Sequence, residues 1–286
     1  MPDQTVKYNP TTPSIGVFDS GLGGLSVLKY FLQELPEYHY VYLGDTARLP
    51  YGGKSPETIY RYAREAVDFL FQAGCRLVII ACNTASSQAL RRLQQEYLPA
   101  KWPDRRVLGV IRPLAEIIAG NEKIRTVGII GTRATVDSAA YPLELHKLRP
   151  ELKVEQAAAP LLVPLIEEGW MAKPETKMIL KKYLRPLKMK KVDALILGCT
   201  HYPFLYREIR QIMGARVSLP HPGTVIAGAL ADYLRRHPEL GLTPARPASR
   251  RYYTTDDPQR FRVLGEKFLG CRLDNLQRVE ITELTI

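Results

Sequence analysis

The sequence predicts an α/β protein with two similarly built parallel-sheet domains that face each other across a cleft. Short apolar runs alternate with helix-like segments along the chain, a pattern typical of parallel sheets covered by helices. The 286 residues exceed the usual size of a single core. The spacing from Gly16 to Gly128 is also close to the spacing from Cys82 to Cys199. Together these observations indicate two related halves.

The first half contains four expected strands and two expected helices. Leu77–Ile80 is the clearest strand, because a continuous apolar run fits a strand buried on both faces of a parallel sheet. The strands are expected at 14–18, 38–43, the run that ends at Cys82, and 107–111. The helices are expected from about Leu25 and over 56–73.

The second half repeats this alternation, and the chain then returns to the first domain. Strands are expected at 124–130, 154–156 and the run that ends at Cys199, and helices after Gly131, near 161–169 and near 173–187. Pro and Gly cluster in 219–223 and 243–247, which indicates loops. A strand at 251–255, a helix from about Pro258 and a strand at 279–281 are expected to complete the first domain. We therefore predict a first domain of residues 1–109 plus 215–286 and a second of residues 110–214.

The net charge of +11 comes from basic residues in short, scattered runs such as Arg91-Arg92 and 188–191. Scattered runs favour solvated helix faces over a nucleic-acid-binding stripe, with attraction of a small anion as the functional alternative. No apolar stretch reaches 18 residues, so we expect no transmembrane helix. Residues 1–13 lack the apolar core of a signal peptide and are typical of a loose tail. These features predict a cytoplasmic protein with neither a membrane nor nucleic acid as its partner.

Two of the four cysteines stand in matched settings. Cys82 and Cys199 each follow an apolar run and precede hydroxyl or amide residues and helix-like sequence. That junction is where open α/β sheets bind ligands, so the pair suggests two bases on opposite faces of one carbon. Cys75 and Cys271 lack this setting and are interpreted as structural. No C-x-x-C pair or zinc-finger spacing occurs, so we expect reduced thiols and no metal.

A thiol is a competent base only when its pKa falls from about 8.5 toward neutrality, and a helix N-terminus lowers it. Cys82 and Cys199 both precede expected helix starts, and His201 can exchange a proton with Cys199. Cys82 taken alone also fits a buried structural cysteine. Cys199 with His201 also fits a thiol hydrolase, which leaves Cys82 without a role and lacks a recognisable oxyanion-hole motif.

Two polar loops follow the first two strands. The first loop, 18–25, does not complete a dinucleotide motif, because the next residue, Ser26, stands where the third glycine would be. Asp19 would also repel a phosphate. A short polar anchor fits better than a phosphate site, with Ser20 and backbone groups binding a carboxylate and Asp19 binding an ammonium group. The alternative is a tight turn with Asp19 as a helix cap. In 44–53, Pro50-Tyr51-Gly52 is either an ordinary turn or a loop that places backbone groups and a phenol over a ligand.

These motifs resemble the cofactor-independent aspartate/glutamate racemase superfamily. The matching segments lie in the order and spacing of that family, and the first glycine loop is similar to its glutamate branch. They are 16–25, 44–52, 81–86, 164–169 and 198–203.

The resemblance implies two α/β domains with glutamate between them and no cofactor. It implies that Cys82 takes the α-proton from D-glutamate and Cys199 takes it from L-glutamate. Asp19 is then expected to assist Cys82, and Glu167 and His201 to assist Cys199. The implied substrate contacts are Asp19, Ser20, Pro50, Tyr51, Gly52, Asn83, Thr84, Thr132, Thr135, Thr200 and His201.

The resemblance further implies a homodimer that supplies D-glutamate for peptidoglycan and cell-wall biogenesis. The chain departs from the family pattern at Arg112-Pro113-Leu114 and at 220–223, away from the catalytic motifs. One alternative is a racemase for another amino acid. The other is a basic protein that binds nucleic acid or a topoisomerase-type partner and has kept the fold without the catalysis.

Overall fold

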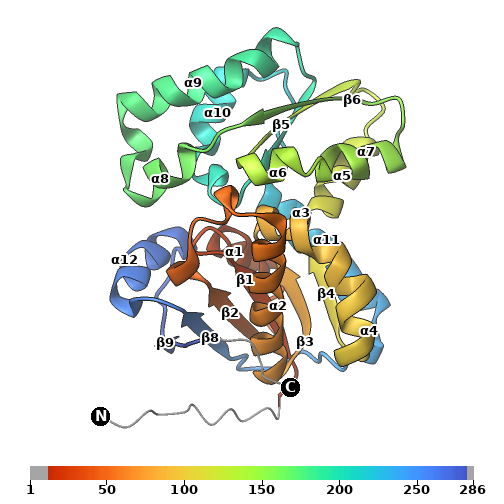
Figure 1. Cartoon of the computed structure of the whole chain (residues 1–286), viewed down its shortest axis with the longest axis vertical. Coiled ribbons are helices and arrows are strands. Elements are labelled where there is room, and N and C mark those ends of the chain that lie inside the picture. Colours follow the sequence, from red (N-terminus) through yellow and green to blue (C-terminus); the bar gives the residue numbers. More distant parts are fainter. Residues whose placement is uncertain (1–11, 282–286) are drawn as a thin grey trace.

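The computed structural model describes residues 12–281 and arranges them as two parallel sheets with helices on both faces of each (Figure 1). The expected N-terminal tail therefore lies, apart from Thr12 and Pro13, outside the described residues. Among the described residues no helix is long and apolar enough to cross a membrane.

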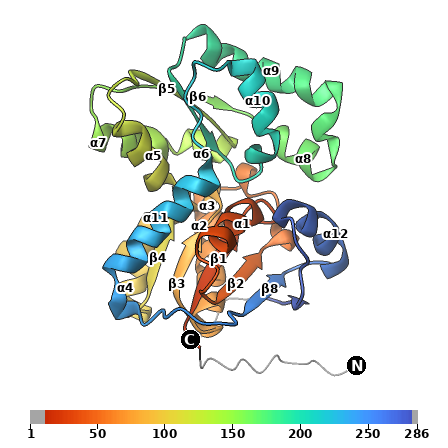
Figure 2. The same ribbon diagram turned by 180° about the vertical axis from the view of Figure 1, so that it is seen from behind.

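The first sheet has six parallel strands in the order β4-β3-β1-β2-β8-β9. They are β1 (Ser14–Asp19), β2 (Tyr40–Gly44), β3 (Cys75–Ile80), β4 (Arg106–Gly109), β8 (Arg250–Thr254) and β9 (Leu276–Arg278). Helices α2 (Pro56–Gln72) and α3 (Asn83–Arg92) cover one face. The other is covered by α1 (Leu25–Glu34), α11 (Pro222–Arg236) and α12 (Pro258–Leu269) (Figures 1 and 2). The short α4 (Leu98–Lys101) follows α3.

Alternation along β1 supplies both layers of this core. Val17 packs with the α1 and α11 side, and its neighbour Phe18 with the α2 and α3 side, because successive side chains of a strand point to opposite faces. All six residues of β1 are buried, so the strand is apolar on both faces, as a central parallel strand requires.

The second sheet has three parallel strands in the order β6-β5-β7, half the number in the first. They are β5 (Thr126–Gly131), β6 (Lys153–Ala158) and β7 (Ala194–Gly198). On one side pack α5 (Ile111–Ala119) and α7 (Ala140–Leu148), and on the other α8 (Leu162–Glu167), α9 (Pro174–Met189) and α10 (Tyr206–Met213). The short α6 (Arg133–Asp137) follows β5.

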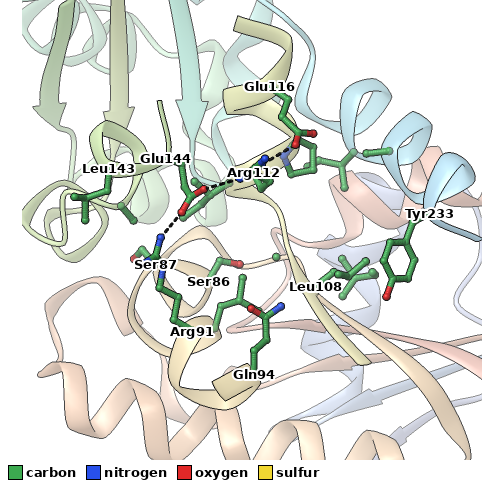
Figure 3. Close-up of a pocket in the computed structure, with 18 of the residues that line it drawn as sticks. Ser86, Ser87, Arg91, Gln94, Leu108, Arg112, Glu116, Leu143, Glu144 and Tyr233 are labelled. Carbon is green, nitrogen blue, oxygen red and sulfur yellow. Dashed lines mark hydrogen bonds and ion pairs between the residues drawn. The ribbon is translucent and has the colours of Figure 1, made fainter. Parts of the chain in front are cut away.

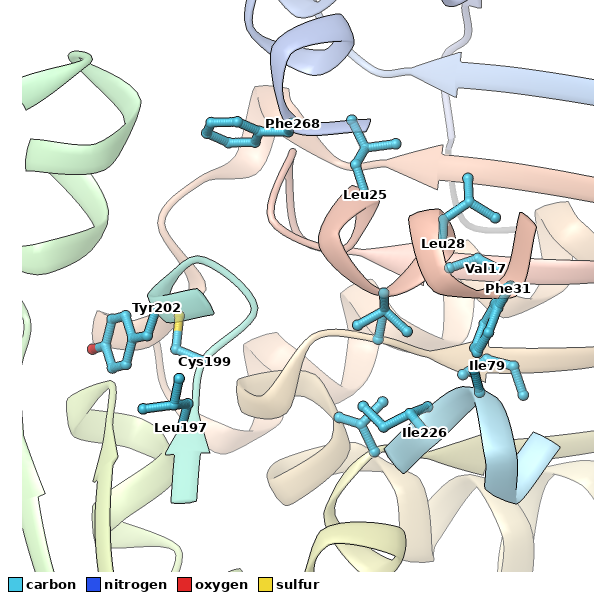
Figure 4. Packing of buried hydrophobic residues seen from close by; sticks show 14 of the residues in the cluster. Val17, Leu25, Leu28, Phe31, Ile79, Leu197, Cys199, Tyr202, Ile226 and Phe268 are labelled. Carbon is cyan, nitrogen blue, oxygen red and sulfur yellow. The ribbon is translucent and has the colours of Figure 1, made fainter. Parts of the chain in front are cut away.

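The chain enters the second sheet through α5 and returns through α11, which packs against both α1 and α5 (Figure 2). The second sheet is thus inserted between β4 and β8, and β8 and β9 join the first sheet as expected. One hydrophobic cluster continues from the first sheet to the loop after β7, where Cys199 and Tyr202 lie (Figure 4). The domain boundaries at 109/110 and 214/215 stay a prediction.

Three expected elements are wrong in detail. The strand expected to reach Ile111 ends at Gly109, because Ile111, Leu114 and Ile118 form the buried stripe of α5. The loop expected over 219–223 ends early, because Pro222 takes the first position of α11, where proline's missing N–H costs nothing. The last strand is β9, and Val279–Ile281, where it was expected, is not a strand.

Candidate active site

The two matched cysteines lie just past the carboxyl ends of β3 and β7. Cys82 caps the N-terminus of α3, and Cys199 directly follows β7. Both are nearly buried, at 5% and 6% exposed. Only Cys82 begins an α-helix, because a short 3-10 turn, Tyr202–Leu205, separates Cys199 from α10. The expectation that both sulfurs stand at helix starts is therefore wrong for Cys199.

The Cys82 thiol is buried and has two polar neighbours. Its Sγ lies 3.3 Å from Ser20 Oγ and 3.5 Å from the Ala85 backbone nitrogen, which donates to it. Burial raises the pKa of Cys82 to about 12, and the nearby Asp19 carboxylate adds to the rise, which outweighs both hydrogen bonds. The helix N-terminus was expected to lower the pKa of Cys82, but burial outweighs that effect. Cys82 is therefore a protonated thiol at neutral pH.

Cys199 has a hydrogen-bonding partner of its own. Its Sγ lies 3.9 Å from His201 Nδ1, and His201 Nε2 lies 3.0 Å from Glu167 Oε1 at the end of α8. Burial alone would lower the pKa of His201, but the contacts with Cys199 and Glu167 raise it above its usual range. The two ring nitrogens of His201 thus connect Cys199 to Glu167.

The first glycine loop brings Asp19 against the Cys199 loop. Asp19 is fully buried, and its carboxylate accepts hydrogen bonds from Thr200 Oγ1 at 3.2 Å and from the Gly21 backbone at 2.9 Å. Ser26 Oγ donates to the Thr200 carbonyl at 2.8 Å. The N-cap of α1 is Gly24, so the alternative of Asp19 as the helix cap is wrong. Burial raises the pKa of Asp19, and His201 opposes that rise.

Threonine hydroxyl groups from the two halves lie within hydrogen-bonding distance of each other beside α3. Thr84 Oγ1 lies 2.8 Å from Thr132 Oγ1 and 3.3 Å from Thr135 Oγ1. The Asn83 side chain, one residue before, accepts a 2.6 Å hydrogen bond from the Tyr141 hydroxyl of α7. Sequence reasoning missed Tyr141, because a tyrosine at a helix start carries no signal of a partner 58 positions away.

The Pro50-Tyr51-Gly52 loop packs against the second half through Gly52, where an added Cβ would stand 2.9 Å from Thr132 Cβ. Pro50 is exposed. Tyr51 is buried and donates its hydroxyl hydrogen to Asp45, so its phenol anchors the loop and is not free to cover a ligand. Asp45 was also missed: it is fully buried and accepts hydrogen bonds from Arg48 Nε and Thr255 Oγ1 as well.

The other two cysteines differ from each other. Cys75 is buried in β3, as a structural cysteine should be. Cys271 is exposed, so no packing supports the structural interpretation there.

A separate groove of about 590 Å³ lies between the halves and is lined partly by α3, α5 and α11 (Figure 3). Within it Glu144 forms ion pairs with Arg91 and Arg112, at 2.5 Å and 3.3 Å. None of the predicted site residues lines this groove. Around the cysteines, by contrast, Asp19, Ser20 and Asn83 are at most 8% exposed. The residues around the two cysteines are therefore buried in this structure.

Comparison with known proteins agrees with this arrangement. A profile of the Asp/Glu/Hydantoin racemase family matches residues 16–229. The glutamate racemase of Syntrophus aciditrophicus (strain SB) is 41% identical over 275 residues, which cover 96% of this chain and 99% of that protein. That of Geobacter metallireducens is also 41% identical, over 94% of this chain and 97% of its own. The crystal structure of Francisella tularensis glutamate racemase in complex with D-glutamate superposes with a TM-score of 0.86, at 36% identity, over 94% of this chain and 98% of that one. The chain belongs to the Asp/Glu/Hydantoin racemase family.

Proposed function

We propose that this protein interconverts L- and D-glutamate by moving the α-proton between two thiols. The observation that carries the proposal is the pair Cys82 and Cys199, each at a strand end and each with its own polar partner. The full-length likeness to proteins named glutamate racemase supports glutamate as the substrate.

In the L-to-D direction, the Cys199 sulfur takes the α-proton from one face of the carbon. The Cys82 thiol then gives its proton to the opposite face. This leaves a thiol at Cys199 and a thiolate at Cys82, and the reverse reaction runs from that state. His201 and Glu167 carry the proton that Cys199 must lose before the next L-to-D turnover. Ser20 and the Ala85 N–H donate to the Cys82 thiolate while it exists.

The negative charge that develops on the substrate carboxylate needs donors that are already in place. The first N–H groups of α3, at Asn83 and Thr84, have no partner within the helix and point out of its N-terminus, where an anion is favoured. The hydroxyls of Thr84, Thr132 and Thr135 stand beside them. Asp19 faces the substrate ammonium group, with Ser20, Thr200 and the 50–52 loop as further contacts. Closure of the two halves excludes water, which strengthens each of these interactions.

We extend the proposal to where and in what form the protein acts. The protein works in the cytoplasm as a homodimer and supplies D-glutamate for peptidoglycan.

The test is proton NMR of L-glutamate with the enzyme in D₂O, without added cofactor, alongside polarimetry. Loss of the α-proton signal together with decay of optical rotation to zero supports the proposal. Unchanged signals with folded, reduced enzyme contradict glutamate as the substrate. The same assay with aspartate then separates a racemase for another amino acid from a protein that has lost catalysis.

A further inference from the structure

Tyr141 joins the two halves at the candidate site. Its hydroxyl, on α7 beside the second sheet, donates to Asn83 Oδ1 on α3 at a distance of 2.6 Å. Asn83 directly follows Cys82 in the chain. This hydrogen bond is therefore one residue away from one of the two thiols.

The ring of Tyr141 is also next to the second thiol. It is fully buried in the cluster that α5 and α7 form on the second sheet. A Cβ built on Gly198, one residue before Cys199, would stand 3.2 Å from Tyr141 Cε2. The ring thus lies against the end of β7, and its close packing fixes where the hydroxyl points.

The hydrogen bond determines how the Asn83 amide is oriented. A protonated phenol donates to the amide oxygen, and burial raises the pKa of Tyr141, so the donor stays protonated. With Oδ1 occupied, the Nδ2 amino group points away from Tyr141, and within residues 12–281 it has no acceptor. Without the phenol, the amide can flip and present its oxygen to the incoming carboxylate, and the two oxygens then repel each other.

We propose that Tyr141 is a positioning residue that holds the Asn83 amide with Nδ2 toward the substrate α-carboxylate. This rests on the proposed function. Because the phenol and the amide belong to different halves, the orientation is fixed only when the halves are closed. Tyr141 thereby links closure to the readiness of the carboxylate donor.

The test is a double-mutant cycle of Tyr141→Phe and Asn83→Ala, read as kcat/KM for glutamate. The Phe variant keeps the ring and removes the hydroxyl, and we expect a loss of about 10- to 100-fold, which corresponds to about 1.4 to 2.7 kcal/mol of transition-state binding. In the Asn83→Ala background the same change should have no further effect, because Tyr141 acts through Asn83. A Tyr141→Phe variant within twofold of wild type, or an equal loss in both backgrounds, overturns the proposal.

Tyr40→Phe is the matched control. Tyr40 is equally buried and donates to the Leu35 carbonyl, outside the site. The Tyr40→Phe variant should lose about as much thermal stability as Tyr141→Phe and keep the wild-type kcat/KM.

A second measurement keeps the proposal testable if Tyr141→Phe does not fold. In ¹⁵N-labelled wild type, the side-chain amide signals of Asn83, assigned from their absence in Asn83→Ala, should shift when D-glutamate is added. Unshifted signals in an enzyme that racemises glutamate overturn this inference alone. A folded wild type with no racemase activity overturns the proposed function instead.

Discussion

Gly23 lies against His201 so closely that a Cβ on Gly23 would stand 2.4 Å from the imidazole Nδ1. The imidazole is held from its other ring nitrogen by Glu167, so it has little room to retreat. Glycine at position 23 is therefore a condition for placing the His201 imidazole beside Cys199.

Gly23→Ala should lower racemase activity about 100-fold, the cost of displacing a catalytic group by roughly 1 Å. Polarimetry with both enantiomers measures the effect. Gly53→Ala is the control, because an added Cβ there meets nothing within 4 Å. Equal activity of the two variants would mean that His201 tolerates displacement.

Alkylation of Cys82 should be slow at neutral pH and rise throughout the alkaline range. Because burial raises the pKa of Cys82 to about 12, the reactive thiolate fraction grows about tenfold per pH unit below that value. Mass spectrometry of the Cys82 peptide after iodoacetamide treatment between pH 6 and 10 gives the profile. Exposed Cys271 is the internal reference for the reagent. A plateau below pH 9 would contradict the buried-thiol description.

Asp45→Asn should destabilise the protein by about 2–3 kcal/mol, because it removes a buried charge that Arg48 and Tyr51 both bind. It should also raise KM, since Tyr51 is released from the anchor of the 50–52 loop. Urea unfolding and initial rates measure the two effects. Asp232→Asn, which removes an exposed carboxylate paired with surface arginines, should change neither. A stable Asp45→Asn variant with unchanged KM would refute the anchoring role.

Gly223→Ala should cost about 1–3 kcal/mol, because the new methyl group would stand 2.2 Å from Tyr30 Cδ2, where α11 packs on α1. Gly228, in the same helix, has open space at that position, so Ala there should gain about 0.5–1 kcal/mol from helix propensity. Thermal and urea unfolding compare the pair. Stabilisation by both substitutions would show that the Tyr30 ring moves aside freely.

The strands were predictable where a continuous apolar run is bounded by polar or glycine residues, as at Leu77–Ile80. Prediction failed where one apolar run crosses an element boundary. Val107–Ile111 contains both the end of β4, at Gly109, and the start of α5, and a single glycine between apolar residues does not by itself mark a boundary. Pro222 was misleading for a related reason, since proline marks loops and helix starts alike.

The candidate site was partly predictable, because its polar residues follow strand ends, and strand ends of parallel sheets gather ligands. The contact between Asp19 and Thr200 joins two such loops 181 positions apart. Asp45 and Tyr141 escaped prediction because their partners Thr255 and Asn83 are distant in sequence. The pKa of Cys82 also escaped prediction, since the burial that raises it comes from the tertiary structure and not from the local motif.

The insertion of the second sheet between β4 and β8 has a consequence for biosynthesis. On the ribosome, β2 is made early, but its neighbour β8 emerges much later: His39 and Ser249, which hydrogen-bond beside this strand pair, are 210 positions apart. At about 5–20 residues per second, the outer edge of β2 waits roughly 10–40 s for its partner. An open strand edge is a template for pairing with other chains. The nascent polypeptide is thus most exposed to aggregation while the inserted unit is being translated, and a chaperone that shields β2 would act in that interval.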